Sequence, residues 1–164
     1  MGFLDSLLGK TKLPEAKTDK LFAISTAAIT LEASLGYRPD GAAGVCIKPM
    51  ESSHYETVRR EIEELLGLSM KETGTEYKLQ KDEYNYLWVV LSDPDLDDLV
   101  NAIQMVAQIL TEQGFGIQIL AAVYRFRGEA VIYWIYNFKQ GAYYPFVPQS
   151  GRQRDTAREF RLKA

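Results

Sequence analysis

Apolar residues recur at three- and four-residue spacing in two stretches of the chain, and this spacing predicts two amphipathic helices. The first follows Ser52 and Ser53, either of which can cap it, and ends at Gly67. The second follows Ser92-Asp93-Pro94-Asp95, a typical helix start, and ends at Gly114. A brief third helix is expected near residues 19–25. The predicted buried stripes are Tyr55, Val58, Ile62 and Leu65 in the first helix, and Leu96, Leu99, Ile103, Val106 and Leu110 in the second.

Alternating apolar and polar positions predict a first strand over residues 27–37, although the alanines there also tolerate a helix. The segment Arg38-Pro39-Asp40-Gly41 places proline and glycine where a tight turn takes them, and the apolar residues 45–47 follow it. We therefore predict a hairpin whose second strand ends at Pro49.

Two further hairpins are predicted downstream. Polar residues 71–78 lead to a return strand over residues 84–91, and Arg127-Gly128-Glu129 separates strands over residues 117–126 and 130–138. A turn at Gln140-Gly141 adds a last strand that ends at Pro148. Neighbouring strands joined by tight turns pair antiparallel.

Aromatic rings are densest in residues 133–148. At a period of two residues, Tyr133 and Ile135 point one way while Trp134 and Tyr136 point the other, so both faces of this strand are apolar. Such a strand is typical of a sheet that is covered on both sides, or of one that closes a partner surface.

These elements predict an α+β fold, in which an antiparallel sheet of three successive hairpins is covered by helices. A length of 164 residues fits one domain. We divide the chain into an N-terminal amphipathic segment and linker (1–18), the α+β domain (19–148) and a basic C-terminal tail (149–164).

Each end of the chain predicts a short helix that cannot be stable alone. An apolar face at the N-terminus would dock on the domain, on a partner or on a lipid surface, and consists of Phe3, Leu4, Leu7 and Leu8. In the C-terminal tail, Arg154, Arg158 and Arg161 share one helical side, and Phe160 is the large apolar residue, which predicts a mobile or partner-docked helix.

Charge is distributed unevenly, although the net charge is only −3. Residues 51–112 carry fourteen acidic and five basic side chains, whereas residues 113–164 carry three acidic and eight basic ones. This asymmetry indicates either an interaction surface, including self-association, or helices that simply carry solvated charge. The acidic middle argues against nucleic acid as a partner.

No residue pattern predicts a catalytic, cofactor-binding or metal site. The single histidine, His54, lacks companions for zinc, although a serine brought to it by the fold is not excluded. Cys46 lies in an apolar run, which indicates a core thiol. The aspartates 93, 95, 97 and 98 lack the glycine and glutamate of a calcium loop and suit a helix start instead.

The chain contains no stretch of about 20 apolar residues and no secretory signal. One cysteine excludes an internal disulfide framework. These features indicate a cytoplasmic protein, with at most peripheral contact at the inner face of the membrane.

Tyrosine, tryptophan and arginine are favoured at protein interfaces, and the last third of the chain is rich in them. The predicted partner-binding residues are Tyr143, Tyr144, Phe146, Arg152, Arg154, Arg158 and Arg161. The alternative is a small-molecule or enzymatic pocket between sheet and helices, lined by Tyr84, Tyr86, Trp88, Tyr133 and Tyr136.

Several segments resemble the PspA-associated family PspAB: MGFLDSLLGK, LFAISTAAITLE, GYRPDGAAGVCIKP, ETGTE, YLWVVLSDPDLDDLV and YWIYNFKQGAYYPFVPQSGRQRD. The resemblance implies a cytoplasmic prokaryotic protein linked to PspA-type membrane-stress systems, often found alongside an HtpX-like membrane protease. It supplies no catalytic residues. The order of elements is also similar to secretion-chaperone-like and YbjN-like domains, which act by binding proteins.

Residues and resemblance together predict a non-catalytic accessory or adaptor protein without a cofactor. Its expected partner is a PspA-type coiled coil or an HtpX-type protease.

Overall fold

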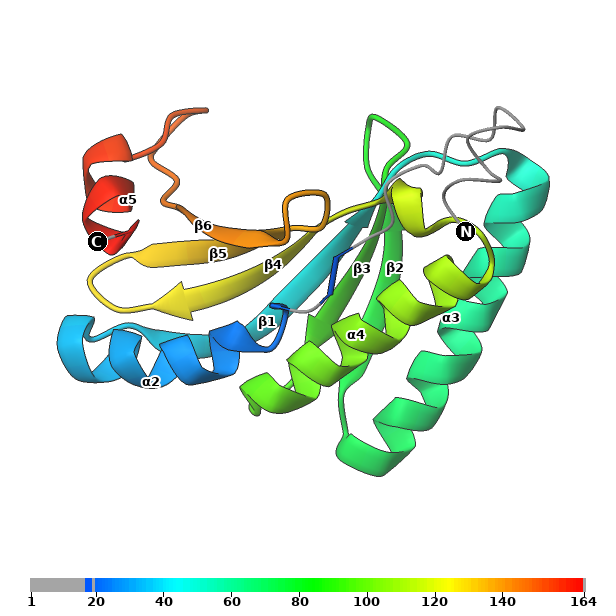
Figure 1. Ribbon diagram of the computed structural model, residues 1–164, viewed down its shortest axis with the longest axis horizontal. Helices are drawn as coiled ribbons and strands as arrows, with labels where there is room; N and C mark the ends of the chain where they lie inside the picture. The colour runs from blue at the N-terminus through cyan, green and yellow to red at the C-terminus, as the bar shows by residue number, and fades with distance from the viewer. Residues whose placement is uncertain (1–16, 19, 164) are drawn as a thin grey trace, which may run out of the picture.

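One antiparallel sheet of six strands organises the computed structural model, which describes residues 17, 18 and 20–163 (Figure 1). The strand order is β2-β3-β1-β4-β5-β6, and every pairing is antiparallel. The α+β class predicted from the sequence is therefore confirmed. The strands are β1 (Arg38–Ile47), β2 (Glu76–Lys81), β3 (Leu87–Ser92), β4 (Ile119–Arg127), β5 (Val131–Asn137) and β6 (Ala142–Phe146).

Helices α2, α3 and α4 lie on one side of this sheet, and α5 lies at its β6 edge (Figure 1). Helix α4 packs between α3 and α2 and contacts β1 and β4, while α5 contacts β6 at the far end. The described helices are α2 (Ala23–Leu35), α3 (Ser52–Thr73), α4 (Leu96–Glu112) and α5 (Thr156–Lys163), with a 3-10 turn at Gly116–Gln118.

The strand predicted over residues 27–37 is wrong, because this segment belongs to α2. Its buried residues Ile24, Ala28 and Leu31 follow helical spacing, whereas Ile29, which suited the alternating pattern, is 72% exposed. Gly36 ends the helix with φ 71°. The brief helix expected near residues 19–25 is thus the start of a longer one.

Strand β1 consequently has no hairpin partner upstream. It pairs with β3 and β4 instead, and the three tight hairpins of the fold are β2–β3, β4–β5 and β5–β6. The predicted turn residues 38–41 lie inside β1, where the register with β4 shifts between Pro39 and Ala43. Gly41, with φ +68°, supplies the bend of this bulge.

The two amphipathic helices are confirmed, but the first is longer than predicted. Helix α3 passes through Gly67 and ends at Gly74, because its buried stripe continues from Ile62 through Leu66 to Ser69. Leu66 takes the buried position predicted for Leu65. Helix α4 is capped by Asp95, whose carboxylate accepts a hydrogen bond from the Asp97 N–H at 2.9 Å.

The core lies between the helices and one face of the sheet, which we call the packed face. Its members come from alternate strand positions and from facing helix stripes. They include Val45, Ile47, Leu87, Val89, Leu91, Tyr124, Phe126, Ile132 and Tyr136 on the strands and Val58, Ile62, Leu99, Ile103 and Val106 on α3 and α4. Strand β5, expected either to be covered on both sides or to close a partner surface, has its fully buried residues, Ile132 and Tyr136, on this face alone.

Gly128 lies in the β4–β5 turn, which packs closely against the residues at the end of α2. A Cβ atom there would lie 2.7 Å from the Tyr37 Cδ1 and 2.8 Å from the Gly36 carbonyl oxygen. The Gly36 carbonyl oxygen can move away only if the backbone shifts. We therefore expect Gly128→Ala to lower the free energy of unfolding by about 1–2 kcal/mol in urea denaturation. Gly44→Ala is the control, since its nearest contact is 3.5 Å, and equal losses for both variants would contradict the prediction.

Candidate functional site

The second face of the sheet carries none of the helices α2, α3 and α4, and we call it the open face. The segment before α5 reaches it only at β6, where Arg154 lies over the Phe146 ring. Cross-strand register aligns its outward side chains across all six strands. On β2 they are polar, as expected beside water, but on the other five strands most are apolar. The apolar members are Trp88, Val90, Ala42, Gly44, Cys46, Ala121, Val123, Val131, Tyr133, Ile135, Tyr144 and Phe146.

A shallow trough of about 190 Å³ runs along the middle of the open face. Small residues on β1, Ala42 and Gly44, form its floor, and larger side chains of the neighbouring strands form its walls. These walls include Trp88, Val90, Val123, Arg125 and Tyr133. The trough thus exposes apolar surface along the central strand.

Asp82 fixes the position of Trp88 beside this trough. Its carboxylate accepts hydrogen bonds from the indole N–H at 2.9 Å and from the backbone N–H groups of Tyr84 and Tyr86. Partial burial opposes ionisation, but these bonds prevail and lower the pKa of Asp82. The Trp88 ring is therefore held in one orientation.

Cys46 lies opposite Trp88 in the β1–β3 pairing. Burial, aided by the charge of Asp82, raises the pKa of this thiol to about 11. The sulfur is therefore protonated near neutral pH and is not an activated nucleophile.

Two arginines on β4 carry positive charge at the rim of the open face. Arg125 lies 2.8 Å and Arg127 3.2 Å from the carboxylate of Asp40 on β1. One carboxylate facing two guanidinium groups leaves this rim with net positive charge.

The structure divides the predicted partner-binding rings between the two faces. Tyr144 and Phe146 lie on the open face, opposite Ile135 and Tyr133 of β5. Tyr143 lies on the packed face, where its ring is 4.8 Å from that of Tyr136 and its hydroxyl donates to the Leu21 carbonyl. Burial raises the pKa of the Tyr143 hydroxyl well above its ordinary value.

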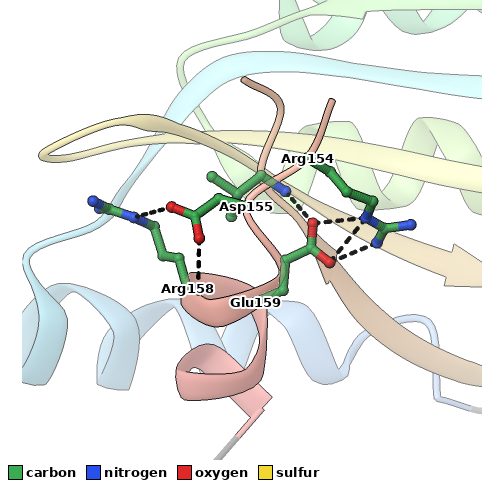
Figure 2. A network of polar contacts seen from close by, with 5 residues as sticks. Arg154, Asp155, Arg158 and Glu159 are labelled. Carbon is green, nitrogen blue, oxygen red and sulfur yellow. Dashed lines mark hydrogen bonds and ion pairs between the residues drawn. The ribbon is translucent and has the colours of Figure 1, made fainter. Parts of the chain in front are cut away.

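The predicted basic residues of the tail are placed by α5, which packs on the domain. Figure 2 shows Glu159 beneath Arg154, whose guanidinium donates to both carboxylate oxygens at 2.7–3.0 Å. The buried Val147 N–H donates to the same carboxylate at 2.9 Å. These hydrogen bonds, led by those from Arg154, lower the pKa of Glu159 although the side chain is buried. Arg154 also lies over the Phe146 ring, 4.9 Å from its centre.

Arg158 is held on the other side of α5. It faces the Asp155 carboxylate (Figure 2) and also donates to the Tyr37 hydroxyl at 2.8 Å and to Glu129 at 3.3 Å. Arg152 and Arg161 are exposed and form no ion pair with a described residue. Two of the four predicted arginines therefore anchor the tail, and two remain available for other contacts.

A groove of about 500 Å³ separates α2 from α5 on the packed face. Trp134 and Tyr143 of the sheet line it, together with Leu162 of α5 and a row of residues on α2. That row is Ala23, Ile24, Ala27, Thr30, Leu31, Ser34 and Leu35. Sequence reasoning missed this groove because the residues of α2 that line it also fit the alternating spacing of a strand.

The pocket predicted from Tyr84, Tyr86, Trp88, Tyr133 and Tyr136 does not form around these residues. Tyr84 is exposed, Trp88 and Tyr133 lie on the open face, and Tyr136 is buried in the core with its hydroxyl bonded to the Lys17 carbonyl.

The remaining candidates for chemistry have structural roles. His54 packs against the Phe115 ring at 5.2 Å. Asp93 is buried and accepts hydrogen bonds from the Thr75 hydroxyl at 2.6 Å and from the Asp95 N–H at 2.7 Å. Within the described residues, no group of three or more histidine, cysteine or acidic side chains is placed to hold a metal.

The predicted anchor residues Phe3, Leu4, Leu7 and Leu8 lie outside the described residues. In the part of the chain that is described, no helix has the length and apolar content needed to cross a membrane.

Comparison with known proteins identifies one family. The family model PspAB, PspA associated protein B, matches residues 1–164, which is the whole chain. The chain belongs to this family. A comparison with curated proteins gives no match.

Proposed function

We propose that this PspAB-family protein is a non-catalytic accessory protein that binds a PspA-type partner on the open face of its sheet. The family description, which names PspA, supports this choice of partner over an HtpX-type protease. The observation that carries the proposal is the apolar character of a sheet face on which none of the helices α2, α3 and α4 packs.

An uncovered sheet face ordinarily presents polar side chains to water. The β2 edge follows this rule with Glu76, Lys78 and Gln80, so the rest of the face is the exception. Val90 is 39% exposed, and Trp88, Tyr133 and Tyr144 are half-buried with no described element above them. A contiguous exposed apolar patch of this kind is typical of a protein interaction site.

The trough fits an elongated partner better than a globular one. Gly44 and Ala42 lower its floor along β1, while Trp88 and Tyr133 rise on either side. An amphipathic helix, such as those of the PspA-type coiled coil implied by the family resemblance, could lay its apolar side chains along this line. Arginines at the rim would attract acidic side chains on the flanks of that helix.

Tyr144 and Phe146, two of the rings predicted to bind a partner, extend the apolar surface toward the edge strand β6. Arg154 borders it over Phe146, and Arg152 remains exposed nearby in the chain. In this proposal Tyr143 has no direct contact with the partner, because it faces the helices. Binding is by shape and charge, and no bond is made or broken.

Filling the trough should weaken this binding strongly without unfolding the protein. Gly44 has an ordinary backbone conformation, and a Cβ atom added there would lie 3.5 Å or more from its neighbours. Because a β-branched residue suits a strand, we expect a folded Gly44→Val protein whose methyl groups occupy the trough. We expect Gly44→Val to weaken binding of the purified PspA-type protein encoded in the same genome at least tenfold, measured by isothermal titration calorimetry.

Ile29→Ala is the matched control, because Ile29 is 72% exposed on α2 and belongs to the other side of the molecule. This variant should bind as the unmodified protein does. Unchanged affinity of a folded Gly44→Val protein would refute the open face as the binding surface. Absence of binding by the unmodified protein would refute the PspA-type partner itself.

A further inference from the structure

The groove between α2 and α5 changes character along its length. Its main part is lined by aliphatic and aromatic side chains, with Trp134 and Tyr143 as floor and Leu31 and Leu162 on the two helices. At the end formed by Ser34, Leu35, Arg161 and Leu162 it continues into a polar hollow of about 310 Å³ lined also by Tyr37, Glu129 and Arg158. An apolar channel that opens at a charged end suits a ligand with one long apolar part and one polar head.

The charges at this end favour an anionic head. Arg158 is already engaged by Tyr37, Asp155 and Glu129. Arg161 forms no ion pair with a described residue. The pKa of Asp155 is lowered mainly by hydrogen bonds from Arg158, and the charge of Arg161 contributes least. One guanidinium without an ion-pair partner among the described residues, at the mouth of an apolar groove, matches one carboxylate.

The length of the groove sets the size of the apolar part. Its lining on α2 extends from Ala23 to Leu35, roughly 18 Å at 1.5 Å per helical residue. The volume of about 500 Å³ lies within the range of about 300–1,000 Å³ that is ordinary for small-molecule sites.

We propose that the groove between α2 and α5 binds a free fatty acid, with its hydrocarbon chain along Trp134 and Tyr143 and its carboxylate at Arg161. This site lies on the packed face, opposite the trough of the open face, so the inference is independent of partner binding.

The test uses laurate, a twelve-carbon fatty acid, and the full-length protein. The chain has two tryptophans, so Trp88→Phe leaves Trp134 as a reporter in the groove. We expect laurate to bind one-to-one and shift the Trp134 emission, and decanoate to bind about fifteenfold more weakly, because each buried methylene contributes about fourfold in affinity.

Three variants locate the ligand. Ala27→Trp, an exposed groove residue replaced by a bulky one, should abolish laurate binding, monitored by calorimetry. Arg161→Gln should weaken laurate about tenfold while leaving 1-dodecanol unchanged, since the alcohol carries no charge. Arg152→Gln, an exposed arginine outside the groove, is the matched control and should change neither affinity.

Several outcomes would overturn the proposal. One is the absence of laurate binding, and another is equal affinity of laurate and dodecanol for the unmodified protein. A third applies if laurate does not bind: if the unmodified protein then binds anionic phospholipid vesicles and Ala27→Trp does not, the groove would be a membrane-binding site. Concentration-dependent dimerisation that Ala27→Trp abolishes, again without laurate binding, would assign it to a second copy of the chain.

Discussion

Replacing Phe126 with alanine should lower the free energy of unfolding by about 3–5 kcal/mol, the largest loss that we expect from a single change. Phe126 is fully buried on the packed face of β4 and belongs to the core between sheet and helices. Alanine would remove most of its apolar surface and leave a cavity that close-packed neighbours cannot fill. Urea denaturation followed by circular dichroism measures the loss.

Phe146→Ala is the matched control, since the same side chain is removed from the open face. Phe146 is half-buried, and its main contacts are the Tyr133 ring at 6.4 Å and the Arg154 guanidinium. We expect a loss of about 1 kcal/mol, of which the cation–π contact supplies part. If both variants lost equal stability, the open face would be a second core and would not be free for a partner.

Removing the carboxylate of Glu159 should have the second largest effect, a loss of about 2–3 kcal/mol for Glu159→Ala, because a buried N–H would be left without an acceptor. Glu159 is buried and joins Arg154 on the chain before α5 to the Val147 N–H beyond β6. The charge-assisted bonds from Arg154 are lost as well. Arg154 is half exposed, so solvent weakens the ion pair itself, and most of the loss comes from the buried bond.

The control for this prediction is Glu129→Ala, because Glu129 pairs with Arg158 but is 83% exposed. A surface ion pair of this kind should contribute no more than about 0.5 kcal/mol. Equal effects of the two glutamate variants in urea denaturation would mean that Glu159 does not anchor α5.

The contribution of Glu159 should also depend on pH. Its pKa is lowered in the folded protein from the ordinary value of 4.5, so the folded state favours the ionised form. The stabilisation is therefore fully present above about pH 4.5 and disappears as the pH falls through the lowered pKa. The stability difference between the unmodified protein and Glu159→Ala should shrink over this acidic range, and a difference that grows toward low pH would contradict the assignment.

Sequence periodicity predicts the fold class because the strongest signals agree with the packing. The stripe of α4 and the turn Arg127-Gly128-Glu129 are local patterns, and the structure confirms both elements. The strand prediction fails in α2 because alternating and helical spacing coincide there, and the choice depends on which side chains the sheet buries. That information is tertiary, so no local pattern contains it.

The candidate sites are predictable only in part, for the same reason. Tyr144 and Phe146, which were predicted together with Tyr143, lie on the open face, whereas Tyr143 turns to the packed face because strand side chains alternate. Four arginines suggest a free basic surface, whereas Glu159 and Asp155 engage two of them. The trough combines residues of four strands, and the groove combines residues of α2, α5 and the sheet, which sequence spacing cannot bring together.

The position of β1 has a consequence for the order in which the protein can fold. Its neighbours β3 and β4 are made later, and its register with β4 pairs Arg38 with Arg127. At about 5–20 residues per second, a ribosome needs roughly 4–18 s to synthesise the residues between these two arginines. Although β3 can pair with one edge of β1 earlier, the nascent chain must leave the β4-facing edge of its central strand unpaired for that time, and an unpaired strand edge is a site for aggregation.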